Sequence, residues 1–402
     1  MMDCCRKVLR ATVIVFAYTI GAPVGAGESA FVGLAATGVN LTPARFMATA
    51  GPLVGPQSMF ALYDARYAKA EKLSYENWVA GGRRANDGSS HYGALRSRYQ
   101  WSVRRGLPVG PTALTRSIYS HGVEMTRALL RGYFEPNGCA IAPYEATSIA
   151  DFELLHLLEG DVRALQCLKG MAEYLGAEYP EDDLDLTGPN SDPRACAILL
   201  QILSVAVRYN FAYKARQSWG STWRQAGVTM VRRISREVRP NGQVVSLAHK
   251  NSGQGDEAFF MNAMLATELL RWHGFVERQP AWVELAQRIV DHLIDEHAQR
   301  GGACLPYTSN DGDACAVDLA AFYVWPALVL WQETGDASYR AFALVNLNAA
   351  GNAFVNGAKQ FNQTYSTGAQ SAEALLSGVN WRRTGQPDGS GAKKLNLPIH
   401  GR

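Results

Sequence analysis

Most of the chain beyond residue 55 carries apolar side chains at the i, i+3, i+4 and i+7 spacing of an amphipathic helix. About twelve segments show this pattern: Pro56–Ala80, Tyr92–Arg105, Thr112–Tyr133, Glu145–Leu158, Val162–Gly176, Pro193–Lys214, Ser221–Val238, Asp256–Trp272, Pro280–Ala298, Asp313–Glu333, Ser338–Val355 and Thr367–Leu376. Strand-like alternation is limited to fragments such as Gln243–Leu247. The pattern therefore predicts an all-α protein with short β pieces confined to loops.

Two kinds of junction connect these helices. Gly160-Asp161 and Gly335-Asp336 are tight links, in which Gly ends one helix and Asp caps the next. Pro-Asn-Gly ends a helix at Pro136–Gly138 and again at Pro240–Gly242, and a short extended piece follows each turn. The turn centres, residues 137 and 241, are 104 residues apart, or two repeats of about 52 residues. The sequence thus predicts helical hairpins with a loop-rich face and a tight face.

This arrangement resembles the (α/α)6 toroid of six-hairpin glycosidases and many polysaccharide lyases. The segments that carry the resemblance are Glu135–Asp161, Gly255–Gly274 and Asp318–Asp336, and the likeness covers about residues 55–380. It is a resemblance of architecture and selects no single family. It implies one catalytic toroid over residues 27–383, with six hairpins and a substrate cleft where the inner helices begin, on the loop-rich face.

The two ends of the chain differ from this helical region. Arg6, Lys7 and Arg10 precede the apolar stretch Ala11–Ala22, and the small residues Val24–Ala26 follow. This order predicts a signal peptide over residues 1–26 and a secreted or periplasmic protein. The stretch is shorter than the roughly 20 residues that cross a bilayer, so we expect no stable membrane insertion after leader cleavage; a short uncleaved anchor is the alternative. Residues 384–402 lack periodicity and are expected to form a disordered tail.

Cysteine usage and charge limit the chemistry. Cys304 and Cys315 flank a loop rich in Asn, Asp and Gly, where a disulfide would form in an oxidising compartment. Cys139, Cys167 and Cys196 are expected to be buried thiols. No Cys/His spacing suits zinc, and we expect neither a metal nor a cofactor. A net charge of +3 with scattered arginines does not indicate nucleic-acid binding. The oligomeric state is left open.

Candidate catalytic residues are carboxylates at the starts of the predicted inner helices. Hydrolysis of a glycosidic bond needs a protonated carboxyl for the leaving group and a second carboxylate that activates water or attacks directly. Glu257 is assigned one role, with Asp256 as its neighbouring competitor, and Glu145 is assigned the other because it follows the equivalent Pro-Asn-Gly turn. His249 and Asp87, in polar loops, are further candidates. Helix capping is the alternative explanation for the acidic residues.

Candidate substrate-binding residues lie in or beside the predicted loops. Sugar rings stack their apolar C–H faces on aromatic rings, a role assigned to Tyr144, Tyr307 and Trp101. The polar candidates are Asn251, Arg84, His91, Tyr92 and Asp151.

These residues predict an exported glycoside hydrolase that cleaves a poly- or oligosaccharide by carboxylate acid/base catalysis. One alternative is a polysaccharide lyase acting on a uronic-acid polymer. There a His or Tyr base would abstract a proton while Arg or Asn neutralises the sugar carboxylate. His249 with Asn251, or His91 with Tyr92 and Arg84, would serve. A second alternative is a non-catalytic glycan-binding protein on the same fold.

Overall fold

The computed structural model describes residues 56–85, 94–105, 112–143, 145, 147–249, 256–302, 304–311, 315–353, 358–365, 372, 375, 376 and 381. The predicted leader, residues 1–26, and the predicted tail, residues 384–402, lie outside these ranges. Within them the chain forms twelve α-helices and no β-strand. The expectation of an all-α protein with about twelve helices is confirmed.

The helices are α3 (Pro56–Ala80), α4 (Ala94–Arg104), α5 (Ala113–Leu129), α6 (Ile149–Glu159), α7 (Val162–Ala177), α8 (Pro193–Arg208), α9 (Trp223–Glu237), α10 (Phe259–Phe275), α11 (Pro280–Gln299), α12 (Ala321–Thr334), α13 (Ala337–Gly351) and α14 (Ala358–Tyr365). The bounds of α3 match the prediction. The α14 helix lies in a segment for which no helix was predicted, whereas most of the predicted helix Thr367–Leu376 lies outside the described ranges; its described residues, 372, 375 and 376, are helical.

Three inner helices begin later than the sequence pattern indicated. The α6, α10 and α12 helices start at Ile149, Phe259 and Ala321, whereas the predicted starts were Glu145, Asp256 and Asp313. Glu145 and Asp256 therefore precede α6 and α10 and lie outside their first turns. For α10 the N-cap position is Ala258, which makes no side-chain cap, so the proposed capping role of Asp256 is wrong.

The expected short β pieces are absent from the described residues, apart from two isolated antiparallel bridges. One joins Ser246 to Asp256 and the other joins Ala258 to Thr308. The extended fragment Gln243–Leu247 does not become a strand because the chain turns into a 3₁₀ segment at Leu247–His249 directly after its bridge. A single bridging residue provides too few backbone hydrogen bonds to extend a ladder.

The tight links form as predicted. Gly160 and Gly335 adopt the left-handed conformation that ends α6 and α12, with φ of 65° and 77°. Asp161 and Asp336 then cap α7 and α13: Asp161 accepts two backbone N–H groups of the first turn, and Asp336 accepts one. Glycine enters this region without a Cβ clash, and a carboxylate satisfies the free amides of a helix start. Long loops, in contrast, lead from α5 into α6, α7 into α8, α9 into α10 and α11 into α12.

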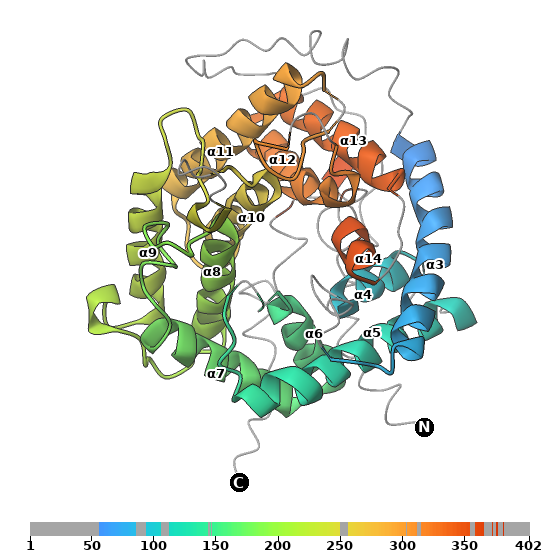
Figure 1. Ribbon diagram of the computed structural model, residues 1–402, viewed down its shortest axis with the longest axis horizontal. Helices are drawn as coiled ribbons and strands as arrows, with labels where there is room; N and C mark the ends of the chain where they lie inside the picture. The colour runs from blue at the N-terminus through green and yellow to red at the C-terminus, as the bar shows by residue number, and fades with distance from the viewer. Residues whose placement is uncertain are drawn as a thin grey trace, which may run out of the picture.

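Contacts between helices follow a regular order. Each even-numbered helix packs on an odd-numbered neighbour, in the pairs α4–α5, α6–α7, α8–α9, α10–α11, α12–α13 and α14–α3. The even-numbered helices also contact one another in series, from α4 through α6, α8, α10 and α12 to α14, and α14 contacts α4. Figure 1 shows the odd-numbered helices along the periphery and the even-numbered ones nearer the centre.

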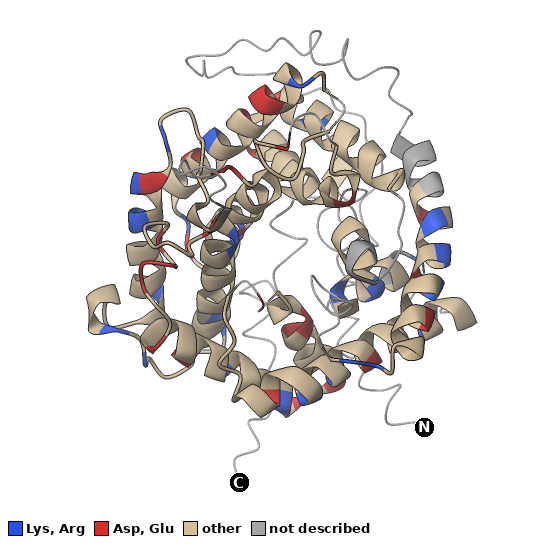
Figure 2. Cartoon of the chain, in the orientation of Figure 1, with Lys and Arg blue, Asp and Glu red and all other residues tan. Residues whose placement is uncertain are grey.

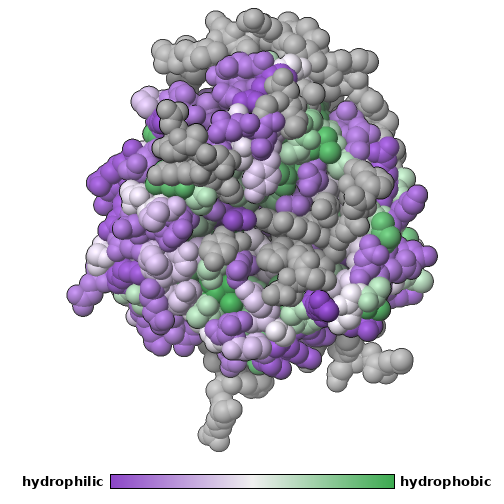
Figure 3. All heavy atoms as spheres, in the orientation of Figure 1, coloured by the Kyte–Doolittle hydropathy of each residue, from purple (hydrophilic) through white to green (hydrophobic). Residues whose placement is uncertain are grey.

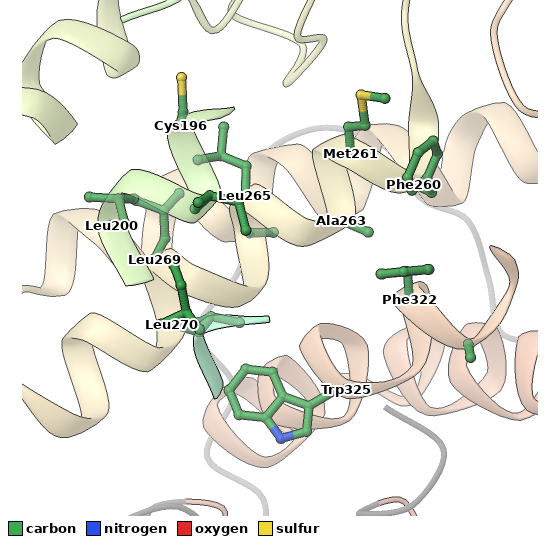
Figure 4. Close-up of a cluster of buried hydrophobic side chains, with 14 of the residues drawn as sticks. Cys196, Leu200, Phe260, Met261, Ala263, Leu265, Leu269, Leu270, Phe322 and Trp325 are labelled. Atoms are coloured by element: carbon green, nitrogen blue, oxygen red, sulfur yellow. The ribbon is translucent and has the colours of Figure 1, made fainter. Parts of the chain in front are cut away.

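Both sets of helices contribute to the main cluster of buried apolar side chains, and Trp78, Ala94 and Met125 form a second, smaller cluster. In Figure 4, Cys196 and Leu200 of α8 lie beside Leu265 and Leu269 of α10, while Phe322 and Trp325 extend from α12. The α12 helix is buried along almost its whole length, in keeping with its uniformly apolar sequence. The face seen in Figure 3 is largely polar where it is described.

Two disulfides cross-link the described part of the chain. Cys304 and Cys315 are bonded as predicted, with their Cα atoms 5.4 Å apart. Cys139 and Cys167 are also bonded, with a Cα–Cα distance of 5.3 Å, so the expectation of free thiols there was wrong. The reason is tertiary: the turn after Pro136 packs against α7, which places two cysteines 28 residues apart side by side. Cys196 is the buried thiol that was expected.

None of the helices in the described ranges is both long enough and apolar enough to cross a bilayer.

Candidate functional site

Glu257 lies between the two isolated bridges, immediately before α10. Its neighbours Asp256 and Ala258 pair with Ser246 and Thr308. The carbonyl oxygen of Glu257 accepts from the Ser309 backbone N–H at 2.9 Å, and its own N–H donates to Ser309 Oγ at 3.1 Å. Two loops from different parts of the chain therefore fix the backbone of Glu257.

Glu257 is 2% exposed, and both of its side-chain oxygens are hydrogen-bonded. Oε1 accepts from Asn262 Nδ2 at 2.8 Å. Oε2 accepts from Gln243 Nε2 at 3.2 Å and shares a 2.9 Å hydrogen bond with His292 Nε2. These partners come from α10, the loop after α9, and α11. These hydrogen bonds offset part of the desolvation cost of burying the Glu257 side chain.

Glu257 contributes to the pKa shifts of two neighbouring groups, His292 and Tyr323. Burial lowers the pKa of His292, but the hydrogen bond and charge of Glu257, with Glu296 and Asp295, outweigh burial and raise it overall. Burial raises the pKa of Tyr323 well above its usual range, and the Glu257 charge adds to the effect. Tyr323 therefore remains a neutral phenol, and its buried hydroxyl has no hydrogen-bond partner among the described residues.

Tyr307 is brought into the same neighbourhood. It precedes Thr308 of the second bridge, is 38% exposed, and its ring centroid lies 5.1 Å from that of Phe260. Its loop is held by Asp311, whose Oδ2 accepts from the Thr308 backbone N–H at 2.7 Å and from the Thr308 hydroxyl at 2.9 Å. Of the predicted site residues, Glu257, Asp256 and Tyr307 are thus gathered at the start of α10.

Glu145 has a different environment. It lies in a turn before α6 and accepts a hydrogen bond from the Tyr133 hydroxyl. Among the described contacts, it shares no hydrogen-bond partner with Glu257. The pairing of these two carboxylates in one catalytic centre stays a prediction.

The remaining predicted residues are dispersed or lie outside the described ranges. Arg84 is exposed, and its carbonyl accepts from Trp78 Nε1 at 3.2 Å. Trp101 is a core residue, 4% exposed and stacked on Tyr67 at 5.0 Å, so it has no open ring face for a sugar. Of His249 only the backbone is described, within the 3₁₀ segment before the gap. Outside the described ranges lie Asp87, His91, Tyr92, Tyr144 and Asn251.

A second cluster, here called the central cluster, consists of charged residues on the even-numbered helices: Arg96 of α4, Asp151 and Glu153 of α6, Arg208 of α8, and Glu268 and Arg271 of α10. Figure 2 shows that charged positions, although most frequent at the periphery, also occur on the helices near the centre, including α6. Only Asp151 of this cluster was selected from the sequence.

Two arginines of the central cluster are paired with glutamates. Arg208 binds Glu153 through two hydrogen bonds, one of them 2.9 Å between Nη2 and Oε2. Arg271 Nη1 donates to Glu268 Oε1, and its guanidinium lies 5.2 Å above the Trp325 ring of α12. Each of these arginines is thus paired with a carboxylate by charge-assisted hydrogen bonds.

Asp151 is the most deeply buried carboxyl of the central cluster, with 0% exposure. Its Oδ1 accepts from the Arg96 backbone N–H at 2.8 Å, and its Oδ2 has no partner among the described residues. Burial raises the pKa of Asp151 to about 6, although the backbone N–H groups of Arg96 and Leu95 and the charge of Arg96 act in the opposite direction. This carboxyl is therefore protonated in mildly acidic solution.

Arg96 completes the central cluster. Burial and then the charge of Arg271 lower the pKa of Arg96 to about 9, while Glu268, Asp151 and Glu153 act to raise it. The side chain is partly buried and still cationic at neutral pH. No hydrogen bond or ion pair joins its guanidinium to another described residue.

Sequence reasoning missed most of both clusters. Gln243, Asn262, His292 and Tyr323 surround Glu257 from four elements, and no local spacing connects them. The central cluster did leave a signal, because Glu268 and Arg271 are a charged i, i+3 pair in an otherwise apolar helix. Charges on the buried side of such a helix indicate a functional or paired site.

No group of three or more His, Cys, Asp or Glu side chains that could hold a metal occurs in the described ranges. A depression of about 700 Å³ lies elsewhere, on the α8–α9 connection, and is lined by Tyr213, Ala215, Gln217, Gly220, Ser221 and Gln225. It contains no titratable residue apart from Tyr213, so it offers no acid or base for a reaction at neutral pH.

Comparisons of the chain with protein-family models, curated proteins and solved structures gave no match.

Proposed function

We propose that the chain is an exported glycoside hydrolase built on an (α/α)6 toroid, with the central cluster as its catalytic centre. The proposed toroid is supported by the series of contacts among the even-numbered helices, which returns from α14 to α4, and by the partner helix outside each of them. The alternation of long loops and tight links supports it as well. Cleavage and export of a leader remain part of the proposal.

The observation that carries the proposal is the state of Asp151. Its carboxyl combines complete burial, a pKa of about 6 and an oxygen without a described partner. A general acid in glycoside hydrolysis must hold a proton near the working pH, which the raised pKa of Asp151 provides, and it must present that proton to the leaving oxygen. In the proposed reaction Asp151 Oδ2–H gives its proton to the glycosidic oxygen as the C–O bond breaks.

Glu268 is the proposed second carboxylate. It accepts a hydrogen bond from Arg271. Glu268 and Asp151 both act to raise the pKa of Arg96, so the two carboxyl groups lie within electrostatic range of the same guanidinium. In an inverting reaction Glu268 would take a proton from the attacking water, and in a retaining reaction it would attack the anomeric carbon itself. Glu153, paired with Arg208, is the alternative for this role.

Glu257 is proposed to position the loops that enter α10. Its three side-chain partners and its backbone bonds to Ser309 join four segments, including the Tyr307 loop. A catalytic role for Glu257 stays a prediction, and substitution separates it from the positioning role. Loss of a positioning group changes KM and stability together, whereas loss of a reacting group lowers kcat.

The decisive experiment is a screen of the purified protein on a broad glycan panel, read both by new reducing ends and by ultraviolet absorbance. For the hydrolase we expect reducing ends without a new chromophore. Asp151→Asn should lower kcat by roughly 10² to 10⁴ because it removes the acid, and Glu268→Gln should act similarly. Glu257→Gln should leave a larger fraction of kcat.

Other outcomes would overturn the hydrolase. A product with ultraviolet absorbance from a new C=C bond would establish the lyase, and binding without turnover would indicate a non-catalytic glycan-binding protein. Full kcat in Asp151→Asn on a substrate that the wild type cleaves would remove Asp151 from the mechanism.

A further inference from the structure

Ser117, His121 and Glu71 are hydrogen-bonded in series between α5 and α3. Ser117 Oγ and His121 Nε2 share a hydrogen bond of 3.1 Å, and His121 Nδ1 shares one of 3.2 Å with Glu71 Oε1. Ser117 and His121 lie one turn apart on α5, whereas Glu71 lies on α3, 50 positions from His121. A hydroxyl, an imidazole and a carboxylate in this order form the arrangement that activates a serine nucleophile.

The His121 imidazole is held in one orientation. Its ring is stacked on Tyr75 of α3, with centroids 3.5 Å apart and an interplanar angle of 5°. The Tyr75 hydroxyl in turn donates to Glu124 of α5, which ties the stacked ring to the same helix as His121. Neutral imidazole has one donor and one acceptor nitrogen. When Nδ1–H donates to Glu71, Nε2 is therefore the acceptor for the Ser117 hydroxyl.

Glu71 is suited to orient this imidazole. It is 1% exposed, and its Oε1 also accepts from Arg98 Nε at 2.8 Å. Burial raises the pKa of Glu71, but the charge of Arg98 and the hydrogen bonds of His121 and Arg98 outweigh burial and lower it overall. An ionised carboxylate at Nδ1 stabilises the imidazolium that forms when a serine hydroxyl gives its proton to Nε2.

The serine end of this series is open to solvent. Ser117 is exposed, and the side chain of His121 is 22% exposed. Both residues belong to α5, one of the peripheral helices in Figure 1, whereas the central cluster lies on the inner ones. A reagent can therefore reach Ser117 without entering the interior.

We propose that Ser117, with His121 as its base and Glu71 as the positioning residue, is a second reactive site that hydrolyses esters. His121 Nε2 takes the hydroxyl proton as Ser117 Oγ bonds to the acyl carbon. It gives that proton to the leaving oxygen as the ester C–O bond breaks. Water then attacks the acyl-serine by the same route, which releases the acid and restores the hydroxyl. The inference is independent of the proposed glycoside hydrolysis.

The position of Ser117 also limits the substrates. Residues inside α5 donate their backbone N–H groups within the helix, so these groups do not stabilise the oxyanion of an attacked ester. The substrate class is therefore esters of acidic alcohols such as phenols, whose C–O bond breaks readily.

Covalent labelling tests the nucleophile. The purified full-length protein is treated with a fluorophosphonate, which bonds to activated serines with loss of fluoride, and the adduct is located by peptide mass spectrometry. Turnover is followed by release of p-nitrophenol from p-nitrophenyl acetate. We expect the adduct on Ser117, and Ser117→Ala should remove both the adduct and the turnover. His121→Gln should lower the labelling rate roughly 10²-fold or more because it removes the base.

A neighbouring serine provides the matched control. Ser120 is also an exposed residue of α5, and Ser120→Ala should label and turn over like the wild type. Circular dichroism verifies that each variant is folded.

Nitrogen-15 NMR of the His121 ring at pH 8 tests the positioning role of Glu71. We expect the Nδ1–H tautomer in the wild type. Glu71→Gln can offer an amide N–H to Nδ1, so it should favour the Nε2–H tautomer and lower the labelling rate. If Glu71→Gln does not fold, the tautomer of the wild type decides.

Three results would overturn the second site. The first is a fluorophosphonate-treated wild type without an adduct on Ser117, and the second is an equal labelling rate in folded His121→Gln. The third is an Nε2–H tautomer of His121 in the wild type, because that nitrogen could not then accept the serine proton.

Discussion

The backbone N–H of Arg96 donates to Asp151 Oδ1 at 2.8 Å, so a side chain of α6 satisfies an amide in the first turn of α4. The bond joins two even-numbered helices at their starts and fixes one oxygen of the carboxyl. The other oxygen stays without a described partner. One residue thus combines a structural role, similar to a helix cap supplied from another helix, with the proposed role of acid.

Asp151 should make the free energy of unfolding depend on pH. Its pKa is raised from 3.8 to about 6 in the folded protein, so the folded state binds the proton more tightly than the unfolded state. This group therefore lowers stability as pH rises from about 4 to 6, by up to about 3 kcal/mol. Asp151→Asn should gain stability relative to wild type over that interval, measured by urea unfolding at pH 4, 5, 6 and 7. A constant difference across the four pH values would show that the pKa is not raised.

His292 should produce a pH dependence at higher pH. The folded-state pKa of His292 is raised despite burial, mainly by its bond to Glu257, so the protonated pair stabilises the fold below the unfolded-state pKa near 6.5. That stabilisation is lost as pH rises through the folded-state pKa. His292→Gln, which keeps a donor but no charge, should cost more at pH 5.5 than at pH 8.5, on the order of 1–3 kcal/mol at the lower pH. The same cost at both pH values would contradict a charged pair.

The two Pro-Asn-Gly turns provide a matched pair of glycine substitutions. Gly138 and Gly242 both have positive φ, at 62° and 89°. A Cβ at Gly138 would meet nothing within 4 Å, whereas one at Gly242 would lie 1.9 Å from the carbonyl oxygen of Arg288. Gly138→Ala should cost about 1 kcal/mol for the left-handed backbone alone. Gly242→Ala should cost clearly more, because the loop must move away from α11. Thermal or urea unfolding of both variants measures the difference, and equal costs would rule out the close approach.

The Cys139–Cys167 disulfide should stabilise the fold against unfolding. It closes a loop of 28 residues, for which loop-closure entropy predicts roughly 3–4 kcal/mol. The double substitution Cys139→Ser/Cys167→Ser should lower the melting temperature by a corresponding amount. Cys196→Ser replaces a thiol outside any disulfide and serves as the control. Reducing agent should mimic the double substitution in wild type and have less effect on the double variant. A double variant as stable as the wild type would mean that the bridge adds nothing.

Helix positions were predictable from sequence because their signals are local. Apolar spacing located α3 to the residue, and the Gly-Asp links were identified from the backbone preferences of two residues. The starts of α6, α10 and α12 were placed too early because acidic residues favour first turns in general. Here Asp256 and Glu257 belong instead to a segment that pairs with distant residues, Ser246 and Ser309. Local preference cannot detect such pairing.

The sequence by itself determined the helical class, the approximate helices and the tight links, since each depends on residues within a few positions of one another. It also marked Glu257, Tyr307 and Asp151 as residues of interest. Only the tertiary structure decided their environments. The packing of α10 and α11 surrounds Glu257 with donors, and the approach of α4 to α6 buries Asp151 and leaves one oxygen and the Arg96 guanidinium without described partners. Charge, burial and hydrogen bonding depend on distance in space and not on distance along the chain. Arg96 and Asp151, which are 55 positions apart, therefore each affect the pKa of the other.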